Sequence, residues 1–247
     1  MTDALRLMTY NIRHGRGGDG RVDLGRIAAV IGERDPDVVL LQEVDYGRFR
    51  TGIVDQAEVL ARRLNMEARF APCMDHEEDG HYGIATLTRR PVVSSSKVEL
   101  PRGPSVRLSE PRAALVTRLD WHDGEVDVIN THLSLRPDER ALQAPALAAL
   151  GEHHGHDHGL LVGGDFNCGP ESGPLRRLLA RFRRVHTARP TWPSRFPILR
   201  LDHVLYRGDL DAGEAHVVAD KLARRASDHL PIVASFAARD AAPAPTT

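Results

Sequence analysis

The chain has 247 residues, of which 41% are hydrophobic and 27% charged, so it is too apolar for a disordered protein. Its 33 basic and 34 acidic side chains nearly cancel, which argues against broad coating of nucleic acid or of an anionic membrane and leaves room only for a local basic groove. Two cysteines are too few for a disulfide framework. No apolar run reaches the length of a membrane helix, and the first residues lack the charged and apolar regions of a secretory leader. We therefore expect a cytoplasmic monomer.

Short apolar strands alternate with helices in the first half of the chain. A Gly-rich loop over residues 15–20 follows the first strand, and residues 23–34 then have helical spacing with Asp23 as a suitable N-cap. A second helix is predicted over residues 54–64. Strands are predicted at residues 5–10, 38–41, 68–72, 84–88 and 92–100.

The second half repeats this alternation. A helix rich in Ala and Leu is predicted over residues 137–150, and the arginines at positions 176, 177, 181, 183 and 184 are interpreted as one solvated helix face. Strands are predicted at residues 113–119, 126–130, 160–162, 202–206, 215–218 and 232–236. The two halves, 5–98 and 112–236, suggest two similar α/β layers packed sheet to sheet within one domain, residues 1–238, followed by a disordered tail, 239–247.

Polar side chains follow or begin the predicted strands at six places. Such groups can converge along one edge of a sheet, and carboxylates without a neighbouring Lys or Arg are costly to bury unless a cation neutralises them. A bound divalent metal accounts for several of them together, and oxygen donors favour Mg²⁺ or Mn²⁺ over structural zinc. The six segments are Thr9-Tyr10-Asn11, Leu41-Gln42-Glu43, Asn130-Thr131-His132-Leu133, Gly164-Asp165-Phe166-Asn167, Leu201-Asp202-His203 and Ser227-Asp228-His229.

These six segments, in this order over residues 5–236, resemble those of the endonuclease/exonuclease/phosphatase superfamily. That superfamily includes pancreatic-type deoxyribonucleases, abasic-site nucleases, neutral sphingomyelinases and inositol-polyphosphate phosphatases. The resemblance implies an α/β fold, namely a four-layer α/β/β/α sandwich of two packed mixed β-sheets with helices on the outer faces. It also implies a hydrolase that depends on Mg²⁺ or Mn²⁺ and acts on a phosphate ester.

The resemblance assigns expected roles to the polar residues. Glu43 is expected to be the principal metal ligand, with Asn11 and Asp228 helping to hold the metal or its waters. Asp165 is expected to orient or deprotonate the attacking water, and Asn167 to hold the phosphate or that nucleophile.

Two histidines and one arginine complete the expected site. His229 resembles the family's phosphate-binding imidazole, whose other nitrogen Asp202 would hold; a carboxylate partner fixes the tautomer and stabilises the cation. His132 is expected to be a second phosphate contact or the acid that protonates the leaving oxygen. Arg112, in a stretch common in the family, is a candidate rim contact to the substrate.

Each of these residues also has a structural interpretation when taken alone. Asn11 could end a strand, Glu43 could open a solvated loop, and His132 could be a hydrogen-bonded histidine of the core. The cluster of histidines in residues 153–158 is interpreted as a solvated loop rather than as a metal site, and Cys168 as a bystander near the site.

The leading hypothesis is a metal-dependent phosphoesterase that cleaves a phosphodiester by in-line attack of water. The low aromatic content of 5% and the absence of net positive charge weigh against a dedicated nuclease, and no hydrophobic membrane hairpin of the sphingomyelinase type is evident. Open alternatives are a phosphomonoesterase acting on a small molecule or lipid headgroup, and a catalytically inactive binding module. The inactive module predicts loss of Glu43, Asp165 or His229, and all three are present.

Overall fold

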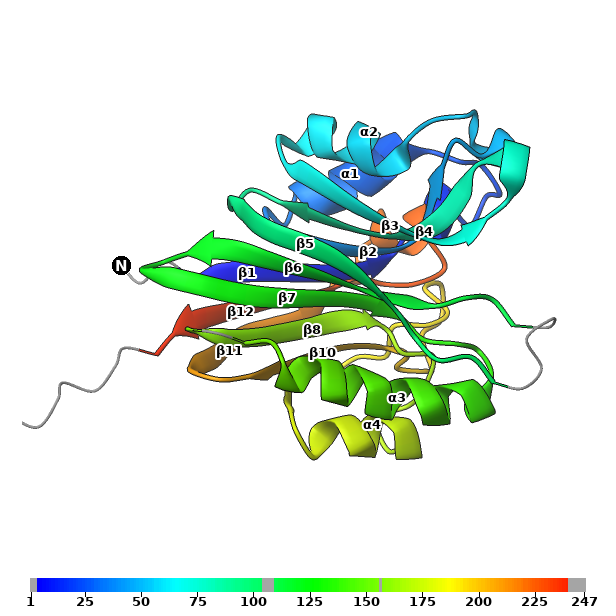
Figure 1. Cartoon of the computed structure of the whole chain (residues 1–247). Helices are drawn as coiled ribbons and strands as arrows, with labels where there is room; N and C mark the ends of the chain where they lie inside the picture. Colours follow the sequence, from blue (N-terminus) through cyan, green and yellow to red (C-terminus); the bar gives the residue numbers. More distant parts are fainter. Residues whose placement is uncertain (1–3, 104–108, 156, 240–247) are drawn as a thin grey trace, which may run out of the picture.

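A computed structural model describes residues 4–103, 109–155 and 157–239. Two six-stranded mixed sheets pack face to face, with α1 and α2 on one outer face and α3 and α4 on the other (Figure 1). The predicted four-layer α/β/β/α sandwich is confirmed. The four covering helices are α1 (Leu24–Gly32), α2 (Gln56–Leu64), α3 (Pro137–Glu152) and α4 (Gly173–Leu179).

The first sheet has the order β11-β12-β1-β2-β4-β3 and the second has the order β5-β6-β7-β8-β10-β9. The strands of the first sheet are β1 (Leu5–Asn11), β2 (Val38–Tyr46), β3 (Glu67–Asp75), β4 (His81–Thr88), β11 (Leu210–Val217) and β12 (Ile232–Ala238). Those of the second are β5 (Val92–Glu99), β6 (Ala113–Trp121), β7 (Gly124–His132), β8 (Gly159–Asp165), β9 (Arg183–Arg184) and β10 (Asp202–Arg207). Four short helices connect them: η1 (Arg13–Gly15), η2 (Phe49–Thr51), η3 (Glu77–Asp79) and α5 (Ala223–Ala226).

The two sheets do not correspond to the two halves of the chain, so that part of the prediction is wrong. Strand β5 leaves the first half and pairs with β6, and β11 and β12 return to the first sheet, where β12 runs antiparallel to β1. Local periodicity identifies strands but not their partners, which long-range pairing decides. The return of the chain supports the proposal of one domain over residues 1–238. Arg239 pairs with Asp211 at 2.7 Å, and the rest of the proposed tail, 240–247, lies outside the described residues.

Several predicted boundaries also need correction. Strand β2 continues to Tyr46 and β7 to His132, because the opposite sheet buries polar side chains that would otherwise end a strand. The arginines do not form one helix face: two lie in α4, whereas Arg183 and Arg184 form the short strand β9. By contrast, the predicted cap of α1 is confirmed, since the Asp23 side chain accepts a hydrogen bond from the backbone nitrogen of Arg26.

A polar tie joins the two sheets inside the apolar core. Gln42 on β2 donates from Nε2 to Oγ1 of Thr9 at 3.2 Å and to Oδ1 of Asn130 on β7 at 2.8 Å. Asn130 donates in return to the carbonyls of Leu41 and Ala85 at 3.0 and 2.8 Å. Thr9, Gln42 and Asn130 are fully buried, so these bonds fix one relative position of the two sheets.

We expect Asn130→Ala to lower the free energy of unfolding by about 2–4 kcal/mol, because two carbonyls and the Gln42 amide would lose buried partners. Urea denaturation at neutral pH measures this loss. Ser95→Ala on the exposed strand β5 serves as the control and should change the free energy by less than about 0.5 kcal/mol. Equal stability of the two variants would contradict a structural role for the tie.

Candidate active site at the strand ends

The topology brings the predicted polar segments to one edge of the sandwich. In each sheet the two central strands are parallel, β1 with β2 and β7 with β8, so their carboxyl ends meet at that edge. His132 is paired with Asp165 in register, and Asp202, the first residue of antiparallel β10, is paired with Asp165 from the other side. His229 lies three residues before the start of β12, which pairs with the end of β1. Parallel strand ends at a sheet edge commonly bear ligand sites.

Glu43 reaches the site through a β-bulge. The register between β2 and β4 shifts between Leu41 and Val44, and Glu43 has a φ of 57°, in the left-handed region. A bulge bends a strand and redirects its side chains. Here Gln42 points between the sheets and Glu43 lines the cavity, instead of opening a solvated loop.

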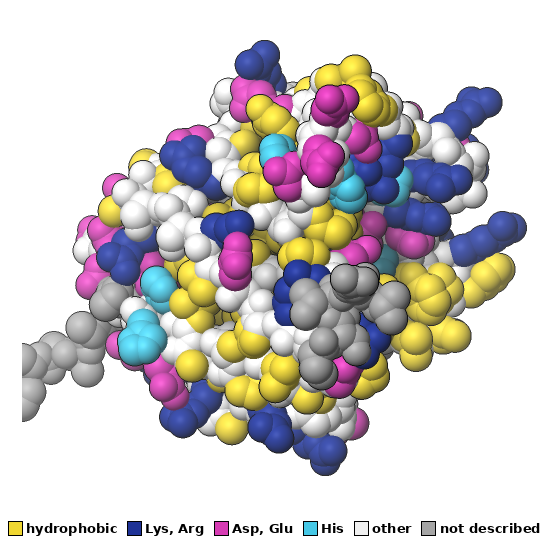
Figure 2. Space-filling view, turned by 45° about the vertical axis from the view of Figure 1, so that its right-hand side comes forward, with side chains coloured by type: hydrophobic (Ala, Val, Ile, Leu, Met, Phe, Trp, Pro, Cys, Tyr) yellow, Lys and Arg dark blue, Asp and Glu magenta, His cyan; other side chains and the backbone are white. Residues whose placement is uncertain are grey.

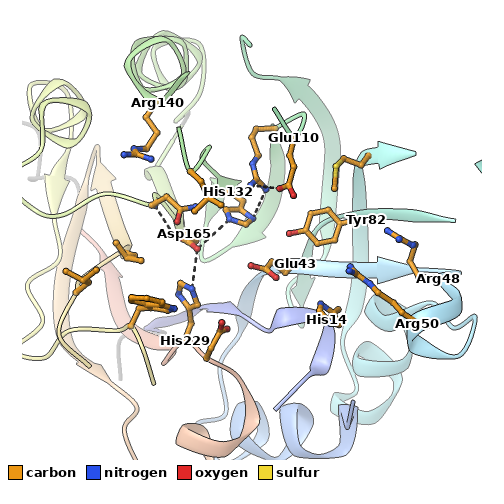
Figure 3. A pocket seen from close by; sticks show the side chains of 18 of the residues that line it. His14, Glu43, Arg48, Arg50, Tyr82, Glu110, His132, Arg140, Asp165 and His229 are labelled. Atoms are coloured by element: carbon orange, nitrogen blue, oxygen red, sulfur yellow. Dashed lines mark hydrogen bonds and ion pairs between the residues drawn. The ribbon is translucent and has the colours of Figure 1, made fainter. Parts of the chain in front are cut away.

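The edge is hollowed into a cavity of about 620 Å³ (Figure 3). Seven of the nine predicted site residues line it, whereas Asn11 and Asp202 lie behind this lining layer and contact it through hydrogen bonds. The seven are Glu43, Arg112, His132, Asp165, Asn167, Asp228 and His229.

The Asp165 carboxylate lies at the centre of this group, between His132 and His229 (Figure 3). Its Oδ2 lies 3.0 Å from Nδ2 of Asn11, 3.5 Å from Nε2 of His132 and 3.6 Å from Nε2 of His229. The backbone nitrogen of Asn167 donates to Oδ1 at 2.9 Å. Burial raises the pKa of Asp165 to about 7, although the neighbouring His229 opposes the rise.

His229 is held by a second buried carboxylate. Its Nδ1 lies 2.9 Å from Oδ2 of Asp202, and Oδ1 of Asp202 has no hydrogen-bond partner in the described structure. Burial alone would lower the pKa of His229, but Asp202 and Asp165 outweigh it and raise the pKa to about 10. His229 is therefore a cation that presents Nε2–H toward Asp165 and the cavity.

His132 has the opposite environment. Nη1 of Arg112 lies 3.1 Å from its Nδ1, and because a guanidinium can only donate, Nδ1 must accept. Burial, Arg112 and His229 hold the pKa of His132 well below its usual range, so the ring is neutral with its proton on Nε2. Arg112 is buried rather than exposed at the rim: its side chain lies beside His132, lines the cavity and is bound to Glu110 at 2.7 Å. Its contact with a substrate stays a prediction.

The oxygen donors at the first-sheet side of the cavity suit a divalent cation. Glu43 forms no ion pair with Lys or Arg among the described residues; burial raises its pKa, Asn11 opposes the rise, and neighbouring Asp228 adds to it. Two carboxylates that raise each other's cost of ionisation are stabilised by a bound cation. Asn11 directs its amide nitrogen, at 2.9 Å, to Glu43 and its oxygen to the backbone nitrogen of Arg13, so it positions the carboxylate rather than offering an oxygen.

A second set of donor atoms could hold a metal ion by distance alone. Atoms of Asp165, Asp202 and His229 lie within 4.8 Å of one another. His229 uses Nδ1 to bind Asp202, and the raised pKa of about 10 favours a protonated ring, which has no lone pair for a metal at Nε2. We therefore favour the Glu43 side of the cavity as the metal site.

The cavity also contains residues that the sequence patterns did not reveal. Tyr82, Arg48 and Arg50 lie beside Glu43, and His14 lies below them (Figure 3). Arg50 binds both oxygens of buried Asp45 at 2.7 Å, which fixes it at the cavity wall. These side chains come from the short helices η1 and η2, the loop before η2 and strand β4, without a recurring motif, and only folding brings them to the site.

Two further expectations concern loops. Among the described residues, the histidines of the 153–158 loop do not form a group that could hold a metal, and His156 lies outside the described residues. The sequence shows no evident membrane hairpin of the sphingomyelinase type, and that remains a prediction, but one loop has an exposed apolar surface. Residues 192–199 form a short hairpin closed by a bridge between Trp192 and Leu199, and it exposes Phe196 and Ile198.

The sandwich and the carboxylate and imidazole groups at its edge define a class of phosphate-ester hydrolases. Residues 8–229 match the sequence profile of the Endonuclease/Exonuclease/phosphatase family, and the chain belongs to that family. Members of the family hydrolyse phosphate esters.

The chain is similar to several bacterial proteins. It is 32% identical over 167 residues to the uncharacterized protein YbhP of Escherichia coli K12, an alignment that covers 64% of each chain. A structure from Beutenbergia cavernae is 24% identical, with a TM-score of 0.75, and the match covers 96% of this chain and 72% of that one. Bacteroides thetaiotaomicron mannosyl-6-phosphatase is 18% identical, with a TM-score of 0.76 and coverage of 94% and 99%. Both structural matches show the shared fold.

We expect Glu43→Gln to weaken Mn²⁺ binding by about tenfold to a hundredfold, because a negatively charged oxygen donor is replaced by a neutral one. Isothermal titration calorimetry measures the affinity without reference to activity. Glu110→Gln, which removes the same charge from the same cavity, is the matched control and should bind Mn²⁺ nearly as the native protein does. Unchanged binding by the Glu43 variant would remove Glu43 from the ligand set.

Proposed function

We propose that this protein is a divalent-metal-dependent phosphoesterase that hydrolyses a phosphodiester by in-line attack of an activated water. The observation that carries the proposal is the convergence of Asn11, His132 and His229 on the buried carboxylate of Asp165. One acceptor surrounded by aligned donors is the arrangement needed to hold a water and an anion together.

Asp165 would orient the attacking water and accept its proton. Its carboxylate is held from two directions, by the Asn11 amide and the Asn167 backbone, so it is fixed before substrate binds. Asn167 is itself restrained by a 2.9 Å bond from Nδ2 to the carbonyl of Leu133, which leaves its side-chain oxygen for the water or the phosphate.

The two imidazoles would bind the phosphoryl oxygens. Each presents an Nε2–H group toward the same point beside Asp165, but His229 carries a charge and His132 does not. Charge that develops on the phosphoryl group in the transition state is stabilised more by a cation than by a neutral donor. We therefore assign the larger catalytic contribution to His229 and treat His132 as a neutral phosphate contact that Arg112 positions.

Glu43 and Asp228 would hold Mg²⁺ or Mn²⁺, with Asn11 keeping Glu43 in place. A bound divalent cation would supply Lewis-acid charge at the phosphoryl oxygens. Arg13 lies 3.5 Å from Asp228 and partly neutralises that carboxylate in the structure.

The shape of the cavity favours a diester over a monoester. Arg140 lines it on one side of Asp165, and Tyr82, Arg50 and Arg48 line it on the other (Figure 3). Room on both sides accommodates two groups esterified to one phosphorus. A phosphomonoesterase and an inactive binding module on the same fold are the competing functions.

We also propose that the protein works as a cytoplasmic monomer. Its two cysteines are free, as expected in a reducing compartment. Within the described residues, no helix has both the length and the apolar character needed to cross a lipid bilayer.

A substrate panel tests the activity. We expect hydrolysis of bis-p-nitrophenyl phosphate with added Mg²⁺ or Mn²⁺, slower hydrolysis of p-nitrophenyl phosphate, and no turnover of either in EDTA, because oxygen-donor sites release Mg²⁺ to chelators. Faster hydrolysis of the monoester would favour the phosphomonoesterase. Inactivity on every ester of the panel with metal present would favour the binding module.

We expect His229→Ala to lower kcat by about 100-fold or more, because it removes a charged donor to the transition state. Asp202→Asn should also lower kcat, because an amide holds the imidazole without stabilising its charge. His203→Gln, a change at the neighbouring buried histidine, is the control and should retain most activity in its folded fraction. Near-native turnover by a folded His229 variant, verified from its melting temperature, would refute the catalytic role of His229.

A further inference from the structure

The hairpin over residues 192–199, here called the apolar hairpin, exposes an unusual amount of hydrophobic surface. Phe196 and Ile198 are 72% and 73% exposed, and Leu199 is 46% exposed. Leu135, on the loop between β7 and α3, is 71% exposed. Large apolar side chains that gather on a surface mark a site of interaction. Figure 2 shows hydrophobic side chains gathered at the right-hand edge of this face, next to Lys and Arg side chains.

The apolar hairpin is rigid, so this exposure is not a consequence of a loose loop. Within it, the backbone nitrogen of Ile198 donates to the carbonyl of Trp192 at 2.9 Å. Ser194 binds the carbonyls of Asp228 and Ser227 at 2.7 Å, and Arg224 donates to the carbonyl of Ser194 at 2.9 Å. The apolar side chains are thus presented to solvent on a fixed support.

The same support carries the active site. Asp228 and His229 directly follow Ser227, to which the hairpin is fastened. Trp192 and Leu199 of the hairpin and Leu135 all line the catalytic cavity. The exposed apolar surface therefore borders the mouth through which a substrate enters.

Unpaired cations lie on the other flank of the hairpin. Arg195, Lys221 and Arg225 are exposed, and none of the three forms an ion pair with a described residue. They line a second hollow of about 720 Å³ that shares Asp228 with the catalytic cavity. Asp19 in this hollow is already paired with Arg26 and Asp228 with Arg13, so the free charge of the hollow is positive.

We infer that the apolar hairpin, Leu135 and these three cations form a surface that docks on an anionic phospholipid bilayer and brings the cavity to a lipid headgroup phosphate. Aliphatic and aromatic side chains beside Lys and Arg are the combination that binds the interface of an anionic membrane. A groove for single-stranded nucleic acid instead needs a series of aromatic stacking platforms. The exposed side chains here are mostly aliphatic. Docking itself does not depend on the proposed function, whereas hydrolysis of the headgroup does.

Co-sedimentation with vesicles tests the docking without reference to catalysis. The protein is mixed with vesicles of phosphatidylcholine alone or with added phosphatidylglycerol, and we expect binding only to the vesicles that contain phosphatidylglycerol. The double variant Phe196→Ser, Ile198→Ser should bind at least about tenfold more weakly, because two side chains that enter the bilayer interface are lost. The double variant Lys221→Gln, Arg225→Gln should also bind the anionic vesicles more weakly than the native protein. This difference between variant and native protein should become smaller at high salt, which screens the charges.

Val93→Ser on the exposed edge strand β5 is the matched control and should bind as the native protein does. All variants should hydrolyse bis-p-nitrophenyl phosphate at the native rate, since none of the changed residues lines the catalytic cavity. Failure of the native protein to bind anionic vesicles overturns the docking surface, whatever its activity. The native protein could instead bind single-stranded DNA but not vesicles, with both double variants losing the DNA binding. That result would assign the surface to nucleic acid and would also overturn the proposed membrane docking. Vesicle binding by a protein inactive on every ester supports docking and contradicts only the proposed catalytic function.

Discussion

The buried carboxylate of Asp165 is the group on which the rest of the site depends. It is 1% exposed, and no Lys or Arg in the described part of the chain forms an ion pair with it. A carboxylate in such a position must be satisfied by hydrogen-bond donors. Asn11 from β1 and the backbone nitrogen of Asn167 after β8 donate to it, and the imidazoles of His132 on β7 and of His229 before β12 lie 3.5 and 3.6 Å from it. The two sheets must therefore stay in one relative position, which the core tie through Gln42 and Asn130 also enforces.

The two imidazoles beside Asp165 show how similar side chains acquire different chemistry from their partners. Asp202 accepts from one ring and keeps it charged, whereas Arg112 donates to the other and keeps it neutral. Both rings consequently direct Nε2–H toward the same carboxylate. A site with one charged and one neutral donor binds an anion without placing two cations in contact, which would repel each other in a buried position.

The segment around Ser227 connects catalysis to the protein surface. Its hydroxyl binds the carbonyl of Asn11 at 2.8 Å, its carbonyl accepts from Ser194 of the apolar hairpin, and the next two residues enter the catalytic cavity. The proposed membrane surface and the proposed metal ligand Asp228 thus share one rigid support. A membrane-bound headgroup would meet the cavity without any movement of the hairpin.

The sequence by itself determined that polar groups occur at strand ends, that Asp23 caps a helix, and that the polar segments match those of one family. These features are local, since each depends on residue type and on spacing of a few positions. The tertiary structure alone decided that β5 joins the second sheet, that β12 pairs with β1, and that a bulge directs Glu43 into the cavity. It also buried Arg112 beside His132 and fastened the apolar hairpin beside the site. Such features depend on contacts between residues far apart in the chain, and local periodicity carries no information about which distant strand or side chain will be the partner.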